Sequence, residues 1–235
     1  MVAPLFPLTL DQVLVRRKGK AVLGPTDLVL DPQGPTIILG PNGSGKTTLL
    51  RVMHGIERVT SGTVRWANPD TSRHAFVFQA PIVLRRSVAE NLAYPLRLTR
   101  APKAEVAAAV DHWLDRIGLT ALKDSPALRL SGGERQKLAI ARALIRKPDV
   151  LFLDEPCANL DGHATRAIEA LLQDAAQSGT HLVMATHDMG QARRLAHDVL
   201  FMLGGNVYEH GPATTIFDTP TTPQLAAFLK GDIVT

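Results

Sequence analysis

A glycine-rich segment in the first quarter of the chain has the composition of a phosphate-binding loop. Residues 40–48 read Gly-Pro-Asn-Gly-Ser-Gly-Lys-Thr-Thr, between the apolar run 37–39 and the helix-like residues 49–53. This fits G-x-x-x-x-G-K-[ST] between a strand and a helix, where glycines let backbone N–H groups turn toward phosphate oxygens. A turn that binds nothing is the alternative, and the flanking strand and helix argue against it. The expected nucleotide-binding residues are Asn42, Gly43, Ser44, Gly45, Lys46, Thr47 and Thr48.

Within this loop, two side chains have separate expected tasks. Lys46 would reach the β- and γ-phosphates, and the Thr47 hydroxyl would hold Mg²⁺. Two acids, Asp154 and Glu155, follow the apolar run 150–153. Asp154 at the strand end would hold Mg²⁺ through water, while Glu155 would polarise the water that attacks the γ-phosphate. Acids that only cap a loop are the alternative, and the presence of the phosphate loop disfavours it.

The composition restricts the class of protein. The chain has 235 residues, of which 45% are apolar, enough for one large domain or a domain with an inserted subdomain. Its one cysteine, Cys157, suits a reducing compartment, and no apolar run is long enough to cross a bilayer. Residues 1–10 lack the charged segment and cleavage site of a signal peptide. The net charge is +4 with scattered basic residues, so we expect no nucleic-acid partner.

The hydrophobic pattern indicates which elements position these residues. Alternation predicts two strands within 8–30 around a turn at Gly19-Lys20, and runs of apolar residues predict buried strands. Because strands and helices alternate in the second half, we expect a parallel sheet with helices on both sides. Trp113 is expected in the core. Residues 81–98 have a mixed pattern that predicts neither a strand nor a helix. The other expected strands are 36–39, 63–66, 75–78, 150–153, 181–186 and 198–203, and the expected helices are 46–53, 101–119, 132–147, 162–177, 188–196 and short ones within 212–229.

Four further motifs resemble those of a known protein family. Residues 130–136, Leu-Ser-Gly-Gly-Glu-Arg-Gln, resemble the signature motif of ABC transporter ATPases. Gln79 is similar to that family's Q-loop, 159–161 to its D-loop and His187 to its H-loop. The order and spacing fit from residue 8 to about residue 211. Ser131-Gly132-Gly133 also begins a helix, where N–H groups and the helix dipole make an anion site.

The resemblance implies an α/β fold with a P-loop NTPase core, an N-terminal antiparallel β-subdomain and an inserted α-helical subdomain. The chain would be a single ABC ATPase domain, 1–235. Residues 1–79 and 136–235 would form the nucleotide-binding core with the β-subdomain, and 80–135 the helical subdomain with the signature motif.

The resemblance also implies site roles and a dimer. Two copies would sandwich two ATP molecules head to tail, and Ser131, Gly132 and Gly133 would cap the γ-phosphate bound to the other copy. Asp161 is also expected among the nucleotide-binding residues. Gln79 would contact Mg²⁺ and the attacking water, and His187 would contact the γ-phosphate and that water. The expected catalytic residues are Glu155, His187, Gln79 and Lys46, and the expected Mg²⁺ residues are Thr47, Gln79 and Asp154.

Two segments depart from the family pattern. The family usually has an aromatic residue near positions 16–18 that stacks on adenine, and here these are Arg16, Arg17 and Lys18. An arginine can stack on an aromatic plane, but the sequence does not select one, so preference for ATP over GTP stays open. Cys157 stands where a small hydroxyl residue is common and is expected to be a packing residue.

The remaining resemblance concerns the process that ATP hydrolysis drives. Residues 76–81 and 88–91 resemble importer ATPases, and 205–211, 216–217 and 228–234 resemble tungstate-type ATPases, with phosphate and polar amino-acid importers as close alternatives. An ABC protein of ribosomes would carry two such domains, and one of chromosomes a long coiled coil between Gln79 and Ser131; both are disfavoured. The implied partners are integral membrane permease subunits and, indirectly, an extracytoplasmic solute-binding protein. The implied location is the cytoplasmic side of the cell membrane, as a peripheral subunit.

Overall fold

The computed structural model describes residues 5–232, and its N-terminal part forms an outer antiparallel sheet. The strands β1 (Leu8–Arg17), β2 (Lys20–Leu30) and β4 (Ser61–Trp66) lie in the order β2-β1-β4. The predicted hairpin is confirmed, but its turn is Lys18-Gly19 rather than Gly19-Lys20. Both turn residues have positive φ (49° and 80°), as the tight hairpin turn that matches strand twist requires.

The central sheet has the strand order β5-β6-β7-β3-β8-β9. The parallel strands are β3 (Thr36–Leu39), β5 (His74–Val77), β6 (Val150–Asp154), β7 (His181–Thr186) and β8 (Asp198–Leu203). β3 pairs with β7 on one side and β8 on the other, and all of its residues are buried. This explains the continuous apolar run before the phosphate loop, since a central parallel strand is covered on both faces.

The expectation of a purely parallel sheet is wrong at one edge. The strand β9 (Asn206–Pro212) pairs antiparallel with β8. Gly204 and Gly205, with φ of 54° and 83°, make the hairpin turn between them. Its burial alternates between partly buried and exposed residues, as an edge strand's does, so it lacks the apolar run that marked the other strands.

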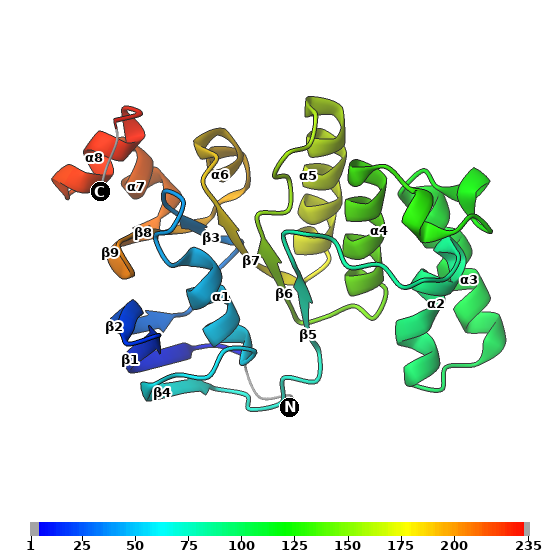
Figure 1. Cartoon of the computed structure of the whole chain (residues 1–235), viewed down its shortest axis with the longest axis horizontal. Helices are drawn as coiled ribbons and strands as arrows, with labels where there is room; N and C mark the ends of the chain where they lie inside the picture. Colours follow the sequence, from blue (N-terminus) through cyan, green and yellow to red (C-terminus); the bar gives the residue numbers. More distant parts are fainter. Residues whose placement is uncertain (1–4, 233–235) are drawn as a thin grey trace.

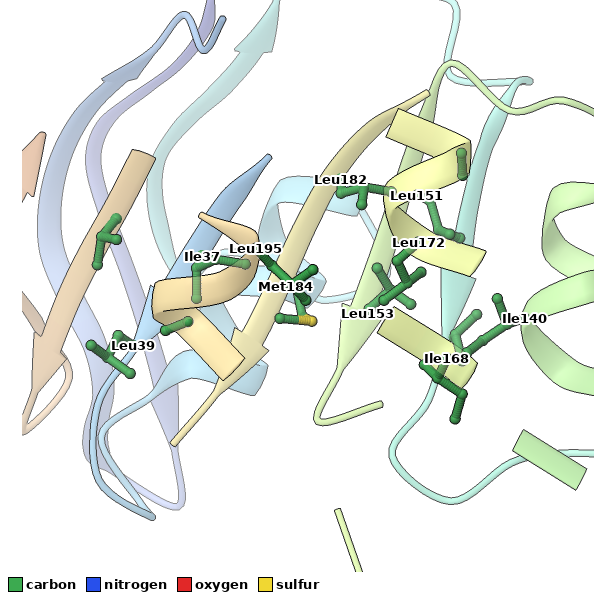
Figure 2. Close-up of a cluster of buried hydrophobic side chains, with 14 of the residues drawn as sticks. Ile37, Leu39, Ile140, Leu151, Leu153, Ile168, Leu172, Leu182, Met184 and Leu195 are labelled. Atoms are coloured by element: carbon green, nitrogen blue, oxygen red, sulfur yellow. The ribbon is translucent and has the colours of Figure 1, made fainter. Parts of the chain in front are cut away.

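Helices cover one face of the central sheet and the outer sheet covers the other, with α1 (Lys46–His54) between the two sheets (Figure 1). Successive residues of β3 serve the two faces: Ile37 and Leu39 pack toward α5 (Gly162–Gln177) and α6 (Met189–Leu195), while Ile38 packs toward α1. Figure 2 shows the first cluster, with Met184 of β7 beside Leu195 and Leu153 of β6 beside Leu172.

A helical region lies beside β5 and α4 (Gly132–Leu144), away from the outer sheet (Figure 1). It contains α2 (Val88–Leu98), α3 (Lys103–Arg116) and the short 3-10 turns Thr120–Leu122 and Ala127–Arg129, packed in a separate apolar cluster. The sequence analysis did not predict α2. Its signals are the capping box between Ser87 and Glu90 and apolar residues at helical spacing, and Pro95 lies inside the helix. Trp113 is partly buried and packs against both neighbouring clusters.

Most other predicted elements are present with shifted ends. The predicted helix 101–119 is shorter, because Pro102 is its N-cap and Gly118 takes φ of 69° after it. The helix predicted at 132–147 ends at Leu144. The predicted short C-terminal helices are α7 (Ala213–Asp218) and α8 (Pro223–Leu229). Across residues 5–232, no helix is long and apolar enough to traverse a bilayer.

Candidate nucleotide-binding site

The loop between β3 and α1 is a backbone cradle that tolerates only glycine at two positions. A Cβ atom at Gly40 would lie 2.2 Å from the carbonyl oxygen of Met202. Gly45 has φ of 100°, and a Cβ there would lie 3.0 Å from the carbonyl oxygen of Val22. The glycine spacing therefore reflects close approach of β2 and β8 to the loop as well as the turn itself.

The backbone N–H groups at the N-terminus of α1 receive no capping hydrogen bond from a side chain. Its N-cap, Gly45, has no side chain to accept from the helix N–H groups, and the first turn contains no acid. The Oγ atom of Ser44 is buried and has no hydrogen-bond partner among the described residues. These groups border a cavity of about 630 Å³. Such a set of unused donors at a helix N-terminus fits a polyphosphate.

Lys46 is held against the loop. Its Nζ atom donates to the carbonyl oxygens of Gly40 (2.8 Å) and Pro41 (3.0 Å). The side chain is 6% exposed, and this burial lowers the pKa of Lys46, although the nearby Glu155 opposes the shift. The ammonium group thus lies in the cavity wall before any ligand supplies a counter-charge.

Thr47 and Asp154 place two oxygen atoms that can ligate a metal ion next to each other. The hydroxyl of Thr47, in the first turn of α1, donates to Oδ1 of Asp154 at the end of β6 (2.7 Å). Asp154 is 1% exposed, and burial raises its pKa against the opposing effects of the Thr47 hydrogen bond and Arg51. Arg51 Nη2 lies 3.9 Å from Oδ2. A hydroxyl and a carboxylate are hard oxygen ligands of the kind Mg²⁺ prefers, so this pair fits that ion.

Glu155 joins groups from three elements. Its φ is 48°, an uncommon value for a residue with a side chain, and its N–H donates to the carbonyl oxygen of Ala185 (2.9 Å). Its Oε1 lies 3.5 Å from Lys46 Nζ, and its Oε2 lies 2.8 Å from Nδ1 of His187. The structure therefore brings Lys46, Glu155 and His187 together.

Gln79 follows β5 and borders two cavities. It lines the cavity over the phosphate loop and also a neighbouring one of about 520 Å³ with Gly132, Arg135 and Asn159. An amide in this position lies between the phosphate loop and the start of α4.

The signature and D-loop residues lie outside the cavity over the phosphate loop. Ser131 is exposed and caps α4: its Oγ accepts from the N–H of Glu134 (3.3 Å), and its own N–H donates to the Glu134 carboxylate (2.8 Å). Asp161 is exposed and caps α5 by accepting from the N–H of Ala164 (2.7 Å). The two helix starts are close, since a Cβ at Gly133 would lie 3.1 Å from Cβ of Ala164.

The sequence analysis did not anticipate several residues of the cavity wall. Ala21 and Val22 of β2, with Gly204 and Gly205 of the β8–β9 turn, line it beside the loop, and the N–H of Gly205 donates to the carbonyl oxygen of Ser44 (3.0 Å). The Gly-Gly pair was the available signal for a tight turn there. Arg17 lines the cavity as well, while Arg16 and Lys18 are not among its lining residues.

Comparison with known proteins agrees with this geometry. Residues 23–158 match the family described as ABC transporter. The chain belongs to the ABC transporter family. The chain is similar to a probable anion import ATP-binding protein of Haloferax volcanii, at 36% identity over 91% of this chain and 83% of that one. It is also similar to the tungstate uptake system ATP-binding protein TupC of Peptoclostridium acidaminophilum, at 40% identity over 81% of this chain and 92% of that one.

Among solved structures, CbiO1 of Clostridium perfringens, part of the ABC transporter complex CbiONQ, has a TM-score of 0.79. It is 28% identical, and the match covers 92% of each chain. The predicted ABC ATPase fold is therefore confirmed, and this ABC ATPase is an ATP-binding, ATP-hydrolysing subunit of the importer type. Other relatives at 34–37% identity are named for sulfate or thiosulfate, phosphate and methionine import, so the relatives' names do not agree on one cargo.

Proposed function

We propose that this ATPase powers the uptake of tungstate or a related oxyanion. The observation that carries the proposal is the 40% identity to a tungstate uptake ATP-binding protein, together with the anion import relative. The C-terminal segments 205–211, 216–217 and 228–234 support the same cargo by their resemblance to tungstate-type ATPases, although 233 and 234 lie outside the described residues. Phosphate or a polar amino acid is the alternative cargo.

In the proposed complex, the triphosphate of ATP lies on the phosphate loop. Backbone N–H groups from Asn42 to Thr48 bind its oxygens, and Lys46 exchanges carbonyl partners for the β- and γ-phosphates. Thr47, Asp154 and Gln79 would hold Mg²⁺, directly or through water. When bound, the ion supplies charge neutralisation at the phosphate oxygens.

Hydrolysis then depends on Glu155 and His187. The carboxylate of Glu155 lies within the cavity wall and accepts the proton of the attacking water. The imidazole of His187, held by its 2.8 Å contact with Glu155, contacts the γ-phosphate and the same water. Gln79, which lines both cavities, would contact that water as well.

A second copy of the chain completes the site. The N-terminus of α4 does not border the chain's own phosphate loop, and the N–H groups that its capping box leaves unbonded would meet a phosphate held by another copy. In a head-to-tail dimer, Ser131, Gly132, Gly133 and Asp161 of one copy approach the ATP of the other. ATP thus acts as a bridge between the copies.

The coupling to transport would run through the helical region. We assign 80–135 to an inserted helical subdomain and 1–79 with 136–235 to the core of a single ABC ATPase domain. An apolar groove of about 360 Å³ between Phe76, Ile82 and Leu98, bordered by Arg142 and Arg146, would receive an integral membrane permease subunit. The chain would then lie on the cytoplasmic face of the membrane and serve an extracytoplasmic solute-binding protein indirectly. We propose no nucleic-acid partner.

Labelled tungstate uptake tests the cargo. Cells that lack this chain are compared with cells that express it or its Glu155→Gln variant at equal level. We expect uptake only with the unmodified chain, and competition by unlabelled tungstate but not by phosphate or sulfate; molybdate competition measures how far the oxyanion class extends. Uptake that does not depend on the chain would remove tungstate and leave the ATPase assignment in place.

A further inference from the structure

A buried carboxylate on α5, that of Glu169, joins this helix to α6 and does not line the cavity over the phosphate loop. The side chain of Glu169 is 8% exposed. Arg194 donates to it twice, from Nε to Oε2 (2.9 Å) and from Nη2 to Oε1 (2.7 Å). The amide Nε2 of Gln191 also donates to Oε1, over a longer distance of 3.5 Å. Because a buried charge is costly without such partners, Glu169 fixes where α6 lies against α5.

These contacts reach the first turn of α6, which directly follows His187. Asp188 is the N-cap of α6, and its Oδ1 accepts from the backbone N–H of Gln191 (2.9 Å). The guanidinium of Arg194 lies over the same turn, since a Cβ at Gly190 would be 3.1 Å from both Arg194 Nη1 and Asp188 Oδ1. The turn that carries His187 is therefore tied to α5 through two side chains of α6.

The Gln191 amide also lies beside the turn that follows Glu155. Burial raises the pKa of the Cys157 thiol to about 11, and the neighbouring Gln191 opposes this shift. Cys157 packs against the apolar cluster that α5 and α6 share. The helix α5 begins at the end of this turn, because Asp161 is its N-cap. One network thus borders both turns whose side chains meet at the 2.8 Å contact between Glu155 and His187.

We propose that Glu169 is a positioning residue for ATP hydrolysis. Through Arg194 and Gln191 it holds the turn that carries His187. This inference rests on the proposed roles of Glu155 and His187 in hydrolysis. The side chain of His187 is 49% exposed, so packing around the ring does little to hold it beside Glu155. The position of the ring then depends on the backbone of α6, and small displacements of reacting groups cost large factors in rate.

ATP hydrolysis by the full chain in two backgrounds tests the proposal. Glu169→Gln keeps the size of the side chain and loses its charge and one acceptor. The kcat should fall about five- to tenfold, with the KM for ATP within about twofold of wild type. In a His187→Ala background, the same change should lower the rate by less than about twofold, because the ring through which Glu169 acts is already absent. Single-turnover release of labelled phosphate resolves the slow rates of that background.

A matched control is available on the same helix. Asp174 of α5 forms an ion pair of 2.7 Å with Arg116, outside the network that reaches α6. Asp174→Asn should therefore change kcat by less than about twofold in either background. A role of Glu169 in stability alone would instead lower the rate by the same factor with and without His187.

The paired variant Glu169→Leu with Arg194→Met separates positioning from stability. It removes both charges together and keeps apolar volume, so its urea midpoint should stay close to that of wild type, while Gln191 loses its acceptor and kcat falls as in Glu169→Gln. A folded paired variant with wild-type kcat overturns the proposal, as does an equal effect of Glu169→Gln in both backgrounds. Full turnover in His187→Ala alone would instead remove the proposed role of His187, and this inference with it.

Discussion

Helices α1 and α4 both start with glycine-rich sequences, yet their N-termini use their N–H groups differently. At α1, the N-cap is Gly45 in a left-handed conformation, with neither a capping side chain nor an acid in the first turn. At α4, Ser131 and Glu134 form a complete capping box, and the pKa of Glu134 is lowered by its hydrogen bonds from Ser131, so a negative charge lies beside the helix end. In Figure 1, α4 lies on the far side of α5 from α1.

This difference makes the two anion sites that we propose unequal. The α1 site is concave and lined by buried Ser44 and Lys46, so it can bind a polyphosphate unaided. The α4 site is exposed and already partly satisfied, so its N–H groups and dipole are suited to completing the surroundings of a phosphate that another site holds. Mutations at the two helix starts should therefore reduce ATP turnover in different ways.

The largest effect is expected at the α1 site. Lys46→Ala removes the ammonium group that we propose to stabilise the developing charge of the phosphates, so ATP turnover should fall by at least about 100-fold. Phosphate release measures it, with Lys103→Ala, an exposed lysine of α3, as the control. Turnover within about fivefold of wild type would contradict the assignment of α1 as the primary site.

Glu155→Gln should separate binding from hydrolysis. The amide keeps the size of the carboxylate but accepts no proton, so turnover should fall by about 100-fold or more while ATP binding persists. Because unhydrolysed ATP would bridge α1 of one copy and α4 of the other, gel filtration should show a dimer with ATP and a monomer without it. Glu105→Gln, on the surface of α3, is the matched control. A variant that binds ATP and elutes as a monomer would rule out the shared site.

A smaller and more selective effect is expected at α4. Ser131→Ala removes the N-cap, which should cost about 1 kcal/mol of stability and reduce turnover by about tenfold at unchanged ATP affinity of the monomer. Ser87→Ala removes an equivalent capping box at α2, so it should lose similar stability and keep full turnover. Equal loss of turnover in both variants would mean that capping alone matters, and that α4 has no phosphate-directed task.

The other end of α1 should show the smallest effect, through pH. His54 ends the helix near His74 of β5, and burial lowers the pKa of both, to about 4 for His74, where repulsion by His54 adds to burial and Asp149 and Asp70 oppose it. The unfolded chain binds a proton near pH 6.5, so stability present at pH 7 should decrease as the pH falls toward 4.

Urea unfolding at pH 7 and pH 5 measures this dependence. His74→Phe, which keeps an aromatic ring beside Trp66 and Phe152, should be less sensitive by about 1 kcal/mol between these two pH values. An equal loss of stability in wild type and variant would show that His74 does not contribute to the pH dependence, and a greater loss in the variant would contradict the sign. Any effect at this end of α1 should leave ATP affinity at pH 7 unchanged.

Local signals predicted much of the fold, and their failures have identifiable causes. The strand–loop–helix around Lys46 was predicted because periodicity and glycine spacing are local properties. The edge strand β9 was missed because half of its residues face solvent and no apolar run marks it. The helix α2 was missed because Pro95 obscured its pattern, although its capping box was present in the sequence.

The sequence by itself determined which chemistry is available: donors for a polyphosphate at 40–48, an acid pair at 154–155 and a second helix start at 131–133. These depend on residue type and short spacing, which the local backbone converts directly into geometry. Only the tertiary structure decided that Glu155 reaches Lys46 and His187, that Arg17 pairs with Glu57, and that the α4 start lies outside the phosphate-loop cavity. Such contacts join distant segments through packing of the two sheets and the helical region, and no short-range pattern encodes them.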